Sequence, residues 1–191
     1  MRMSQLLNFR LALLLSLMNP TLAAEVVPPP TFDLGRGVTA DEIAAWDIDV
    51  RPDGHGLPEG EGNVRQGEQI YREKCIACHG ENGMGGPFDT LVGRLADDAF
   101  PFALDPGVVK TIGNYWPYTT TLYDYINRAM PHNAPGSLGN DEVYALVAYL
   151  LHQNNIVPAD IVLSADNLAT ITMPARYRFV PDNRRGGPEV R

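Results

Sequence analysis

Apolar side chains recur at helical spacing in three segments of the sequence. In residues 140–154 they occupy Val143, Leu146, Val147, Leu150 and Leu151. This i, i+3, i+4, i+7, i+8 spacing predicts an α-helix with one buried face. Residues 63–75 predict a second helix, which Asn63 can cap. A third predicted helix has on one face Leu122, Tyr125, Ile126 and Ala129.

The first two of these helices are expected to cross each other. Gly67 has no side chain, so it leaves room for a second backbone to approach closely. We expect Leu146 and Tyr149 to press on this glycine and on Tyr71. The sequence therefore predicts a core built around two packed helices.

The segments outside the three helices have mainly loop composition. Thr39 and Glu42 stand at the spacing of a capping box, which predicts a short helix within residues 39–47. The remaining flanks are rich in proline and show little periodicity. The expected parts are an N-terminal arm (25–62), a helical domain (63–155) and a C-terminal strap (156–191).

The first 24 residues resemble an export signal. A positively charged start precedes an eight-residue apolar stretch (11–18), and small residues then offer cleavage near Ala23 or Ala24. A membrane anchor is the alternative, but a span needs about 18 or more apolar residues. We expect residues 1–24 to be removed on export to a bacterial periplasm, which leaves no membrane span.

The mature chain would be acidic. Without residues 1–24 it has 13 Lys and Arg residues against 23 Asp and Glu residues, a net charge of −10. This charge argues against nucleic acid and anionic membranes as partners. Acids are concentrated in residues 25–66, whereas residues 174–191 contain five Arg. The acidic and basic ends could bind each other or a partner. The alternative is that both ends are solvated and merely differ in charge.

The only two cysteines form a C-x-x-C-H sequence made by Cys75, Cys78 and His79. A disulfide across two residues would remove little chain entropy, and a thioredoxin-like pair needs a strand–turn–helix setting. Zinc needs four ligands. Covalent haem attachment uses this pattern, with two thioether links and an axial imidazole. We therefore predict one haem c, attached through Cys75 and Cys78, with His79 as the proximal iron ligand.

The sixth iron ligand decides what such a haem does. A second strong ligand favours electron transfer, whereas an open position favours ligand binding or catalysis. The third predicted helix should end at Met130, because Pro131 disfavours the α conformation in the residue before it. Met130 could then turn its thioether toward iron, and a core methionine at a helix end is the alternative. The other candidates are Met84, Met173, His55, His132 and His152.

None of these other candidates is expected to rival Met130. Met84 lies five residues after His79 and would have to round the haem edge to reach the opposite face. Met173 is expected to anchor the strap by packing, and His55 to be a solvated loop residue. Tyr115 and Trp116, in "TIGNYWPY" (111–118), suit the wall of a haem pocket. A generic aromatic core cluster is their alternative, and the two roles are compatible.

These features resemble class I cytochromes c. Gly67 and Tyr71 stand where that family has the crossing residues of its N-terminal helix, and "LVAYL" (146–150) is similar to its C-terminal helix. The resemblance implies an all-α fold in which these helices cross around one covalently bound haem. It also implies extended arms outside that fold.

The resemblance implies two further contacts of the haem. The Met-Pro sequence is similar to the ligand loop of this family, which supports Met130 as the distal ligand. Pro87 matches the proline whose carbonyl accepts the Nδ1–H of the haem histidine. Such a bond would fix the ring of His79 and raise its basicity. An ordinary turn proline is the alternative.

A narrower resemblance covers residues 34–184, nearly the whole mature chain. The stretches "AAWDIDVRPDG" and "TIGNYWPY" carry it, and neither has an obvious role in holding haem. They are similar to the cytochrome subunit of periplasmic sulfur dehydrogenases, the partner of a sulfite-oxidase-type molybdenum protein. The best-known members of that group carry two haem domains, whereas this chain has one C-x-x-C-H sequence.

The narrower resemblance implies a periplasmic electron-transfer subunit. It would take single electrons from a molybdenum-containing sulfur or sulfite dehydrogenase and pass them to a downstream c-type cytochrome. A free cytochrome shuttle and a ligand-binding or peroxidase-like haem protein are the alternatives. Thiosulfate-forming haem enzymes use an additional cysteine ligand, and this sequence has no third cysteine.

Overall fold

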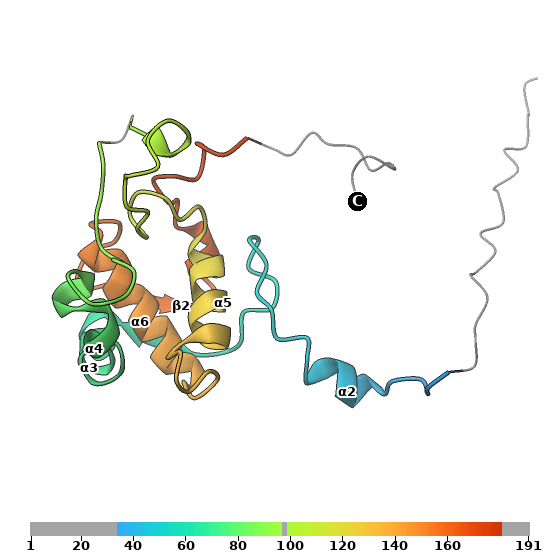
Figure 1. The fold of residues 1–191 in the computed structure, drawn as a ribbon. Helices are drawn as coiled ribbons and strands as arrows, with labels where there is room; N and C mark the ends of the chain where they lie inside the picture. Colours follow the sequence, from blue (N-terminus) through green and yellow to red (C-terminus); the bar gives the residue numbers. More distant parts are fainter. Residues whose placement is uncertain (1–33, 97–98, 181–191) are drawn as a thin grey trace, which may run out of the picture. The chain divides into compact units, whose positions relative to one another are not determined.

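A computed structural model describes residues 34–96 and 99–180. The predicted export signal, residues 1–24, lies outside the described residues. In the part of the chain that is described, no helix is long and apolar enough to cross a membrane. The elements in chain order (Figure 1) are α2 (Ala40–Ala44), β1 (Glu61–Asn63), α3 (Val64–Lys74), α4 (Ile76–His79), η1 (Glu81–Gly83), η2 (Pro101–Ala103), α5 (Thr119–Ala129), α6 (Asn140–Gln153), β2 (Val162–Ser164) and η3 (Leu168–Thr170).

Helices α3 and α6 cross at very close range, as the glycine on α3 predicted. A side-chain carbon on Gly67 would overlap the carbonyl oxygen of Ala145 and would lie 2.7 Å from Cβ of Tyr149. Next to the crossing, the ring centroids of Tyr71 and Tyr149 are 5.1 Å apart. The predicted contact of Tyr149 with Gly67 and Tyr71 is confirmed, whereas the atoms nearest to Gly67 belong to Ala145 and Tyr149 rather than to Leu146. The backbones approach so closely that the backbone carbonyl of Ala145, rather than a large side chain, lies against Gly67.

Helix α6 is buried almost all round, whereas its apolar spacing predicted one buried face. Every residue from Val143 to Leu151 is at most 4% exposed. Helices α3 and α5 and both strands pack against α6, and Tyr144 donates a hydrogen bond of 2.9 Å to the carbonyl of Pro58. The flanking segments therefore cover sides of α6 that the three helices alone would leave open.

A two-stranded antiparallel sheet joins the two ends of the helical domain, and no pattern in the sequence predicted it. Gly62 of β1 pairs with Leu163 of β2. Asn63 ends β1 and caps α3, because its side chain accepts a hydrogen bond from a first-turn amide. Leu163, Leu168 and Met173 are at most 1% exposed. These residues hold the strap against the domain and confirm the predicted packing role of Met173.

The short helix predicted within residues 39–47 is present as α2. None of its residues is buried. Two large apolar side chains in and just after this helix, Ile43 and Trp46, are 52% and 87% exposed. The chain first enters the core at Val50, which is 4% exposed.

Candidate haem site

The two cysteines and the adjacent histidine come from the junction of two helices. Helix α3 ends at Cys75, and α4 runs over Ile76–His79. Neither cysteine is in a disulfide, and burial raises the pKa of the Cys75 thiol to about 11. A reactive redox pair needs a thiol of lowered pKa. Burial therefore disfavours the Cys75 thiolate that a redox pair would use.

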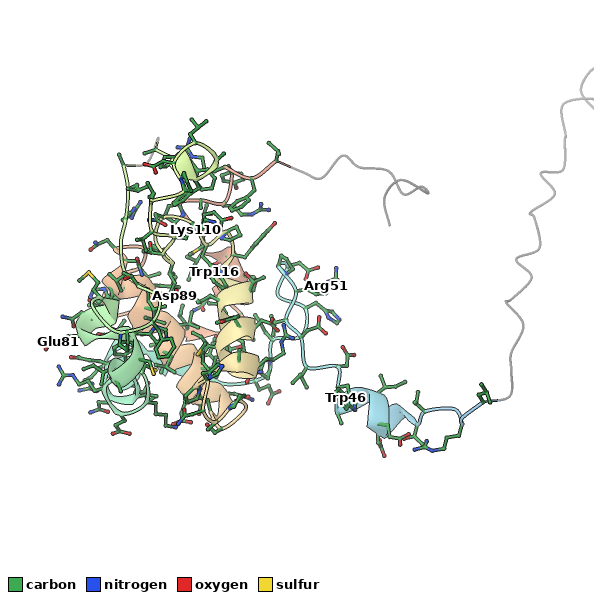
Figure 2. All side chains as sticks on the ribbon, viewed as in Figure 1. Trp46, Arg51, Glu81, Asp89, Lys110 and Trp116 are labelled. Carbon is green, nitrogen blue, oxygen red and sulfur yellow. The ribbon has the colours of Figure 1, made fainter. Side chains whose placement is uncertain are left out.

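A backbone carbonyl orients His79. Its Nδ1 lies 2.8 Å from the carbonyl oxygen of Asp89, in the loop after α4 (Figure 2). A carbonyl can only accept, so Nδ1 carries the hydrogen and Nε2 keeps a lone pair for a metal. The predicted acceptor, Pro87, is wrong: the N–H of Phe88 donates to the carbonyl of Cys78 at 3.1 Å. Because N–H and C=O of a trans peptide point in opposite directions, this bond turns the Pro87 carbonyl away.

The loop after α4 folds back onto the motif through close glycine contacts. A side-chain carbon on Gly86 would overlap the carbonyl oxygen of Cys78. Gly80 has φ of 77°, in the left-handed region that favours glycine, and its carbonyl accepts a bond of 2.9 Å from the Tyr71 hydroxyl. Burial raises the pKa of Tyr71 to about 12, so this hydroxyl remains a donor at neutral pH. The crossing of α3 and α6 thus supports the loop that orients the histidine.

Met130 stands where α5 ends, as the following proline predicted. Its backbone is extended, with φ of −121° and ψ of 149°, while its N–H still donates to the carbonyl of Ile126 at 3.1 Å. Met130 is partly buried and packs against the core. Helices α4 and α5 are separated in Figure 1, with α6 between them in that view. The two predicted iron ligands therefore come from separate elements.

The face of α5 that meets the core differs from the predicted one. Leu122 and Ile126 are buried as predicted, but Tyr125 is 48% exposed. Tyr123 is fully buried instead, with its ring centroid 4.6 Å from that of Tyr144 on α6. Helix α5 packs on α6 on one side and on the incoming chain on another, so its buried surface is wider than one apolar stripe.

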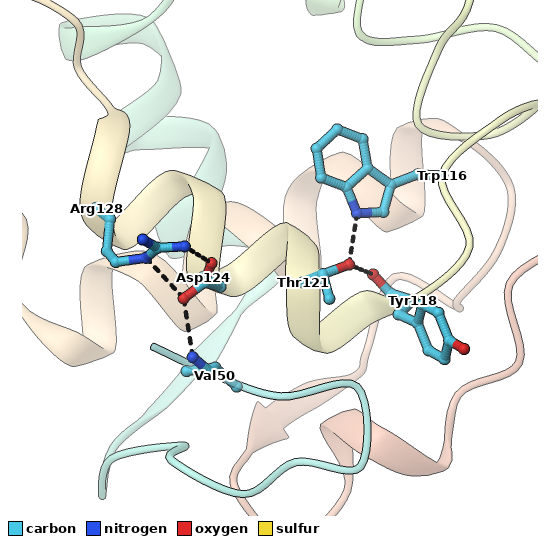
Figure 3. Close-up of polar contacts among 6 residues, drawn as sticks. All are labelled: Val50, Trp116, Tyr118, Thr121, Asp124 and Arg128. Carbon is cyan, nitrogen blue, oxygen red and sulfur yellow. Dashed lines mark hydrogen bonds and ion pairs between the residues drawn. The ribbon is translucent and has the colours of Figure 1, made fainter. Parts of the chain in front are cut away.

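A buried carboxylate holds α5 in place, and the apolar spacing of the sequence did not predict its burial. Asp124 is 8% exposed and accepts a hydrogen bond of 2.8 Å from the N–H of Val50 (Figure 3). Both of its oxygens also pair with the Arg128 side chain, one helical turn later. Thr120 donates to the carbonyl of Pro52 at 3.2 Å. The only signal in the sequence was the i, i+4 spacing of Asp124 and Arg128.

The two predicted pocket aromatics have different surroundings. Trp116 is partly buried against the core, with its ring centroid 5.7 Å from that of Tyr125 on α5. Its Nε1–H donates to Thr121 at 3.0 Å (Figure 3). Tyr115 instead lies in an aromatic cluster with Phe100, Phe102 and Phe179. The cluster interpretation therefore fits Tyr115, and Trp116 remains the predicted pocket wall.

The other candidates for the sixth iron ligand are either exposed or held by contacts elsewhere in the chain. The exposed ones are Met84, His55 and His132. Met173 is buried under the strap, and Nδ1 of His152 lies 3.1 Å from the carbonyl of Val157 at the end of α6. None of these surroundings favours a ligand over Met130.

A second polar group that sequence reasoning missed is Asn154, which directly follows α6 and is 1% exposed. Its Oδ1 accepts from the N–H of Gly93 at 3.0 Å, and its Nδ2 donates to the carbonyls of Leu150 and Leu91 at 2.8 and 3.3 Å. These bonds hold the chain beyond Asp89 against α6. No pattern in the sequence distinguishes Asn154 from an ordinary asparagine at a helix end.

The residues present fit a covalently bound haem. Nε2 of His79 is available for iron, both thiols are unpaired, and Met130 offers a soft thioether ligand. Phe88 and Tyr125 expose apolar surface, at 65% and 48%, that a porphyrin could cover. Among the described residues, no group of three or more His, Cys, Asp and Glu could hold a bare metal ion. The donor set therefore suits an iron porphyrin, which brings four nitrogen ligands of its own.

Comparison with known proteins agrees with this site. The family model described as "Cytochrome C oxidase, cbb3-type, subunit III" matches residues 62–150, so the fold and the site define a cytochrome c domain. A chain in the crystal structure of the sulfane dehydrogenase SoxCD from Paracoccus pantotrophus is 39% identical, with a TM-score of 0.71. The match covers 81% of this chain and 74% of that one. The chain belongs to the class I c-type cytochromes, which confirms the predicted all-α fold and implies a covalently bound haem c.

Two thiosulfate dehydrogenases are also similar to this chain. The one from Allochromatium vinosum is 30% identical over 122 residues, and the one from Stutzerimonas stutzeri is 27% identical over 99 residues. These matches cover 62% and 49% of this chain, but only 40% and 28% of the thiosulfate dehydrogenases themselves. The chain thus spans less than half the length of these relatives, and their whole-protein activity is not carried over to it.

Proposed function

We propose that this cytochrome is a mono-haem electron-transfer subunit of a molybdenum-containing sulfur or sulfite dehydrogenase. The observation that carries the proposal is the match to a chain of the sulfane dehydrogenase SoxCD, at 39% identity over 81% of this chain. Residues 63–155 make up only about half of the sequence. The similarity therefore extends well beyond a generic haem-binding domain.

The haem would be held by four side chains. Cys75 and Cys78 would form the thioether links, His79 would bind iron through Nε2, and Met130 would be the distal ligand. When bound, the haem supplies one-electron chemistry. The protein orients the proximal ring through the carbonyl of Asp89, which lies 2.8 Å from Nδ1. The sequence contains one C-x-x-C-H pattern, so we propose one haem per chain.

Two strong axial ligands favour electron transfer over ligand exchange. We propose that single electrons pass from the molybdenum subunit to this chain and then to a downstream c-type cytochrome. Trp116 would form part of the wall around the cofactor, where it contacts Tyr125 on the helix that ends at Met130.

The proposed organisation follows the expected parts of the chain. Residues 1–24 would direct export and be removed, so the mature protein would work in the periplasm. The N-terminal arm would span residues 25–62, the haem domain residues 63–155 and the strap residues 156–191. Haem c attachment through thioethers takes place outside the cytoplasm, which supports this location.

The similarity to thiosulfate dehydrogenases favours a second candidate, a haem protein that itself acts on thiosulfate. The match is partial, and the sequence has no third cysteine to serve as an additional ligand. This candidate predicts that thiosulfate alone exchanges electrons with the purified haem protein. The leading proposal predicts that a molybdenum partner is required.

The test is gentle purification of the tagged protein from its native periplasm, followed by assays for molybdenum and for haem reduction. We expect molybdenum in a fixed ratio to haem, and haem reduction that depends on sulfite or another sulfur substrate. A lone cytochrome that no sulfur substrate reduces, even with periplasmic extract added back, would contradict the proposal. Reduction by thiosulfate without molybdenum would support the second candidate instead.

A further inference from the structure

Residues 41–49 expose large apolar side chains beside acids, and we call them the docking segment. Ile43, Trp46 and Ile48 are 52%, 87% and 51% exposed, and Trp46 lies in the turn after the short helix α2 (Figure 2). The acids of the segment are Asp41, Glu42, Asp47 and Asp49, and it contains no Lys or Arg. Grouped exposed apolar side chains rimmed by polar residues mark interaction sites.

The docking segment leads directly into the core. Val50 is 4% exposed, and its N–H bonds to the buried carboxylate of Asp124 at 2.8 Å. The carbonyl of Pro52 accepts a further bond from Thr120. These contacts tie the carboxyl end of the segment to α5, the helix that ends at Met130. A partner that held the segment would therefore be connected to the element that carries the proposed distal ligand.

We propose that the docking segment binds the molybdenum subunit, with Trp46 in an apolar groove rimmed by Lys and Arg. This inference rests on the proposed function and names the surface through which the complex forms. Tryptophan is a frequent anchor at the centre of protein interfaces. The segment has four acids and no Lys or Arg of its own, and its net negative charge favours a basic rim even though Arg128 lies near Asp49. An anionic membrane would present like charges, and so would a second copy of this acidic chain outside its arginine-rich residues 174–191.

The match to the SoxCD chain includes this part of the molecule. Residues 50–191 make up about three quarters of the sequence, whereas the match covers 81% of it. The shared structure must therefore extend to residues before Val50. A match that reaches into a segment with three exposed large apolar residues agrees with a role in binding.

The test uses the holoprotein and a purified sulfite-oxidase-type molybdenum protein from the same organism. Titration calorimetry gives the dissociation constant for the wild type, Trp46→Ala and the double variant Ile43→Ala/Ile48→Ala. The matched control is Leu104→Ala, which removes an apolar side chain that is 91% exposed outside the segment. We expect Trp46→Ala and the double variant each to weaken binding at least about tenfold, with the control within about twofold. The variant Asp47→Asn/Asp49→Asn should reduce the salt dependence of binding.

Three outcomes would overturn the inference. Equal dissociation constants for the wild type and the segment variants would show that the segment is not the docking surface. Self-association in sedimentation, abolished by Trp46→Ala, would make a second copy the occupant. A lowered unfolding midpoint of the segment variants with unchanged affinity would show that the segment packs on its own chain.

Sulfite-dependent haem reduction, measured in the same mixtures, separates this inference from the proposed function. If the wild type and all variants bind and are reduced equally, the docking surface is wrong and the proposed function stands. If the variants bind more weakly but reach the wild-type reduction rate at saturating partner, both stand. A wild type that neither binds nor is reduced contradicts the proposed function and this inference together.

Discussion

The two sides of the proposed haem site are held by different kinds of contact. On the side of the C-x-x-C-H motif, helices α3 and α6 meet backbone to backbone at Gly67 and Ala145. On the side of Met130, polar side chains hold α5, above all Asp124 through its bond to the N–H of Val50. The motif side is complete within the helical domain, whereas the Met130 side depends on the chain that enters from the N-terminal arm.

This difference predicts different responses to substitution. A backbone contact has no side chain that can move aside, so an added carbon must push two helices apart. A side-chain contact can be lost while the helices keep their positions, at the cost of an unpaired buried group. Substitutions on the motif side should therefore cost more stability than those on the side of Met130.

Gly67→Ala should give the largest effect. Its new carbon would overlap the carbonyl of Ala145, and we expect a loss of about 3 kcal/mol in the free energy of unfolding. Helix propensity alone would favour alanine by about 1 kcal/mol, so a net loss identifies the crossing. Urea unfolding of the haem-loaded protein measures it, with Gly37→Ala as the control because nothing lies within 4 Å of that position. A stabilised Gly67→Ala variant would contradict the close crossing.

Asp124→Ala should cost about 2 kcal/mol, because it leaves the buried N–H of Val50 without an acceptor. Arg128→Ala removes the other partner of this carboxylate, but the Arg128 side chain is 47% exposed, so its loss should cost less than about 1 kcal/mol. Asp124→Asn keeps an acceptor oxygen and should fall between them. Equal losses for the first two variants in urea unfolding would show that the ion pair, rather than the bond to Val50, holds α5.

Tyr71→Phe should cost about 1 kcal/mol, since the carbonyl of Gly80 loses its hydroxyl donor while the ring contact with Tyr149 is kept. Tyr177→Phe is the control, because Tyr177 is 82% exposed. Thermal or urea unfolding compares the two. A Tyr71→Phe variant as stable as the control would mean that the loop after α4 is held without this bond.

Glu142→Gln should give the smallest effect and a defined pH dependence. The Lys74 ammonium, 2.8 Å away, and then the N–H of Gly139 hold the pKa of Glu142 below its usual value. A lowered folded-state pKa contributes stability above the unfolded value, about 4.3, and loses it as the pH falls through the folded value. The side chains are about one-third exposed, so the loss at pH 7 should be below about 1 kcal/mol. If the free energy of unfolding of Glu142→Gln still differs from that of the wild type at pH 2, the effect does not come from the charge of Glu142.

The motif side could be predicted from the sequence because its determinants are local. Helical spacing marked α3 and α6, and Gly67 marked their crossing. The carbonyl of Ala145 as the nearest neighbour of Gly67 was not predicted, because spacing does not report how closely two backbones approach. The prediction of Pro87 as the acceptor was wrong because the direction of its carbonyl depends on how the loop folds back onto Cys78.

The Met130 side was less predictable because its contacts are distant in sequence. Pro131 predicted where α5 ends, and the structure confirms that end. The bond between Val50 and Asp124 joins residues 74 positions apart, and no local period encodes it. The buried position of Tyr123 was also missed, because it depends on packing against Tyr144 of α6, which is distant in sequence.

The central claim is that two strong axial ligands, His79 and Met130, make this cytochrome an electron carrier. The most direct measurement is the near-infrared absorption spectrum of the oxidised wild-type holoprotein, compared with that of Met130→Ala. We predict a methionine–iron charge-transfer band in the wild type and its loss in the variant, which should keep its haem and have a lower reduction potential. A wild type without this band, whose spectrum Met130→Ala leaves unchanged, would contradict the account.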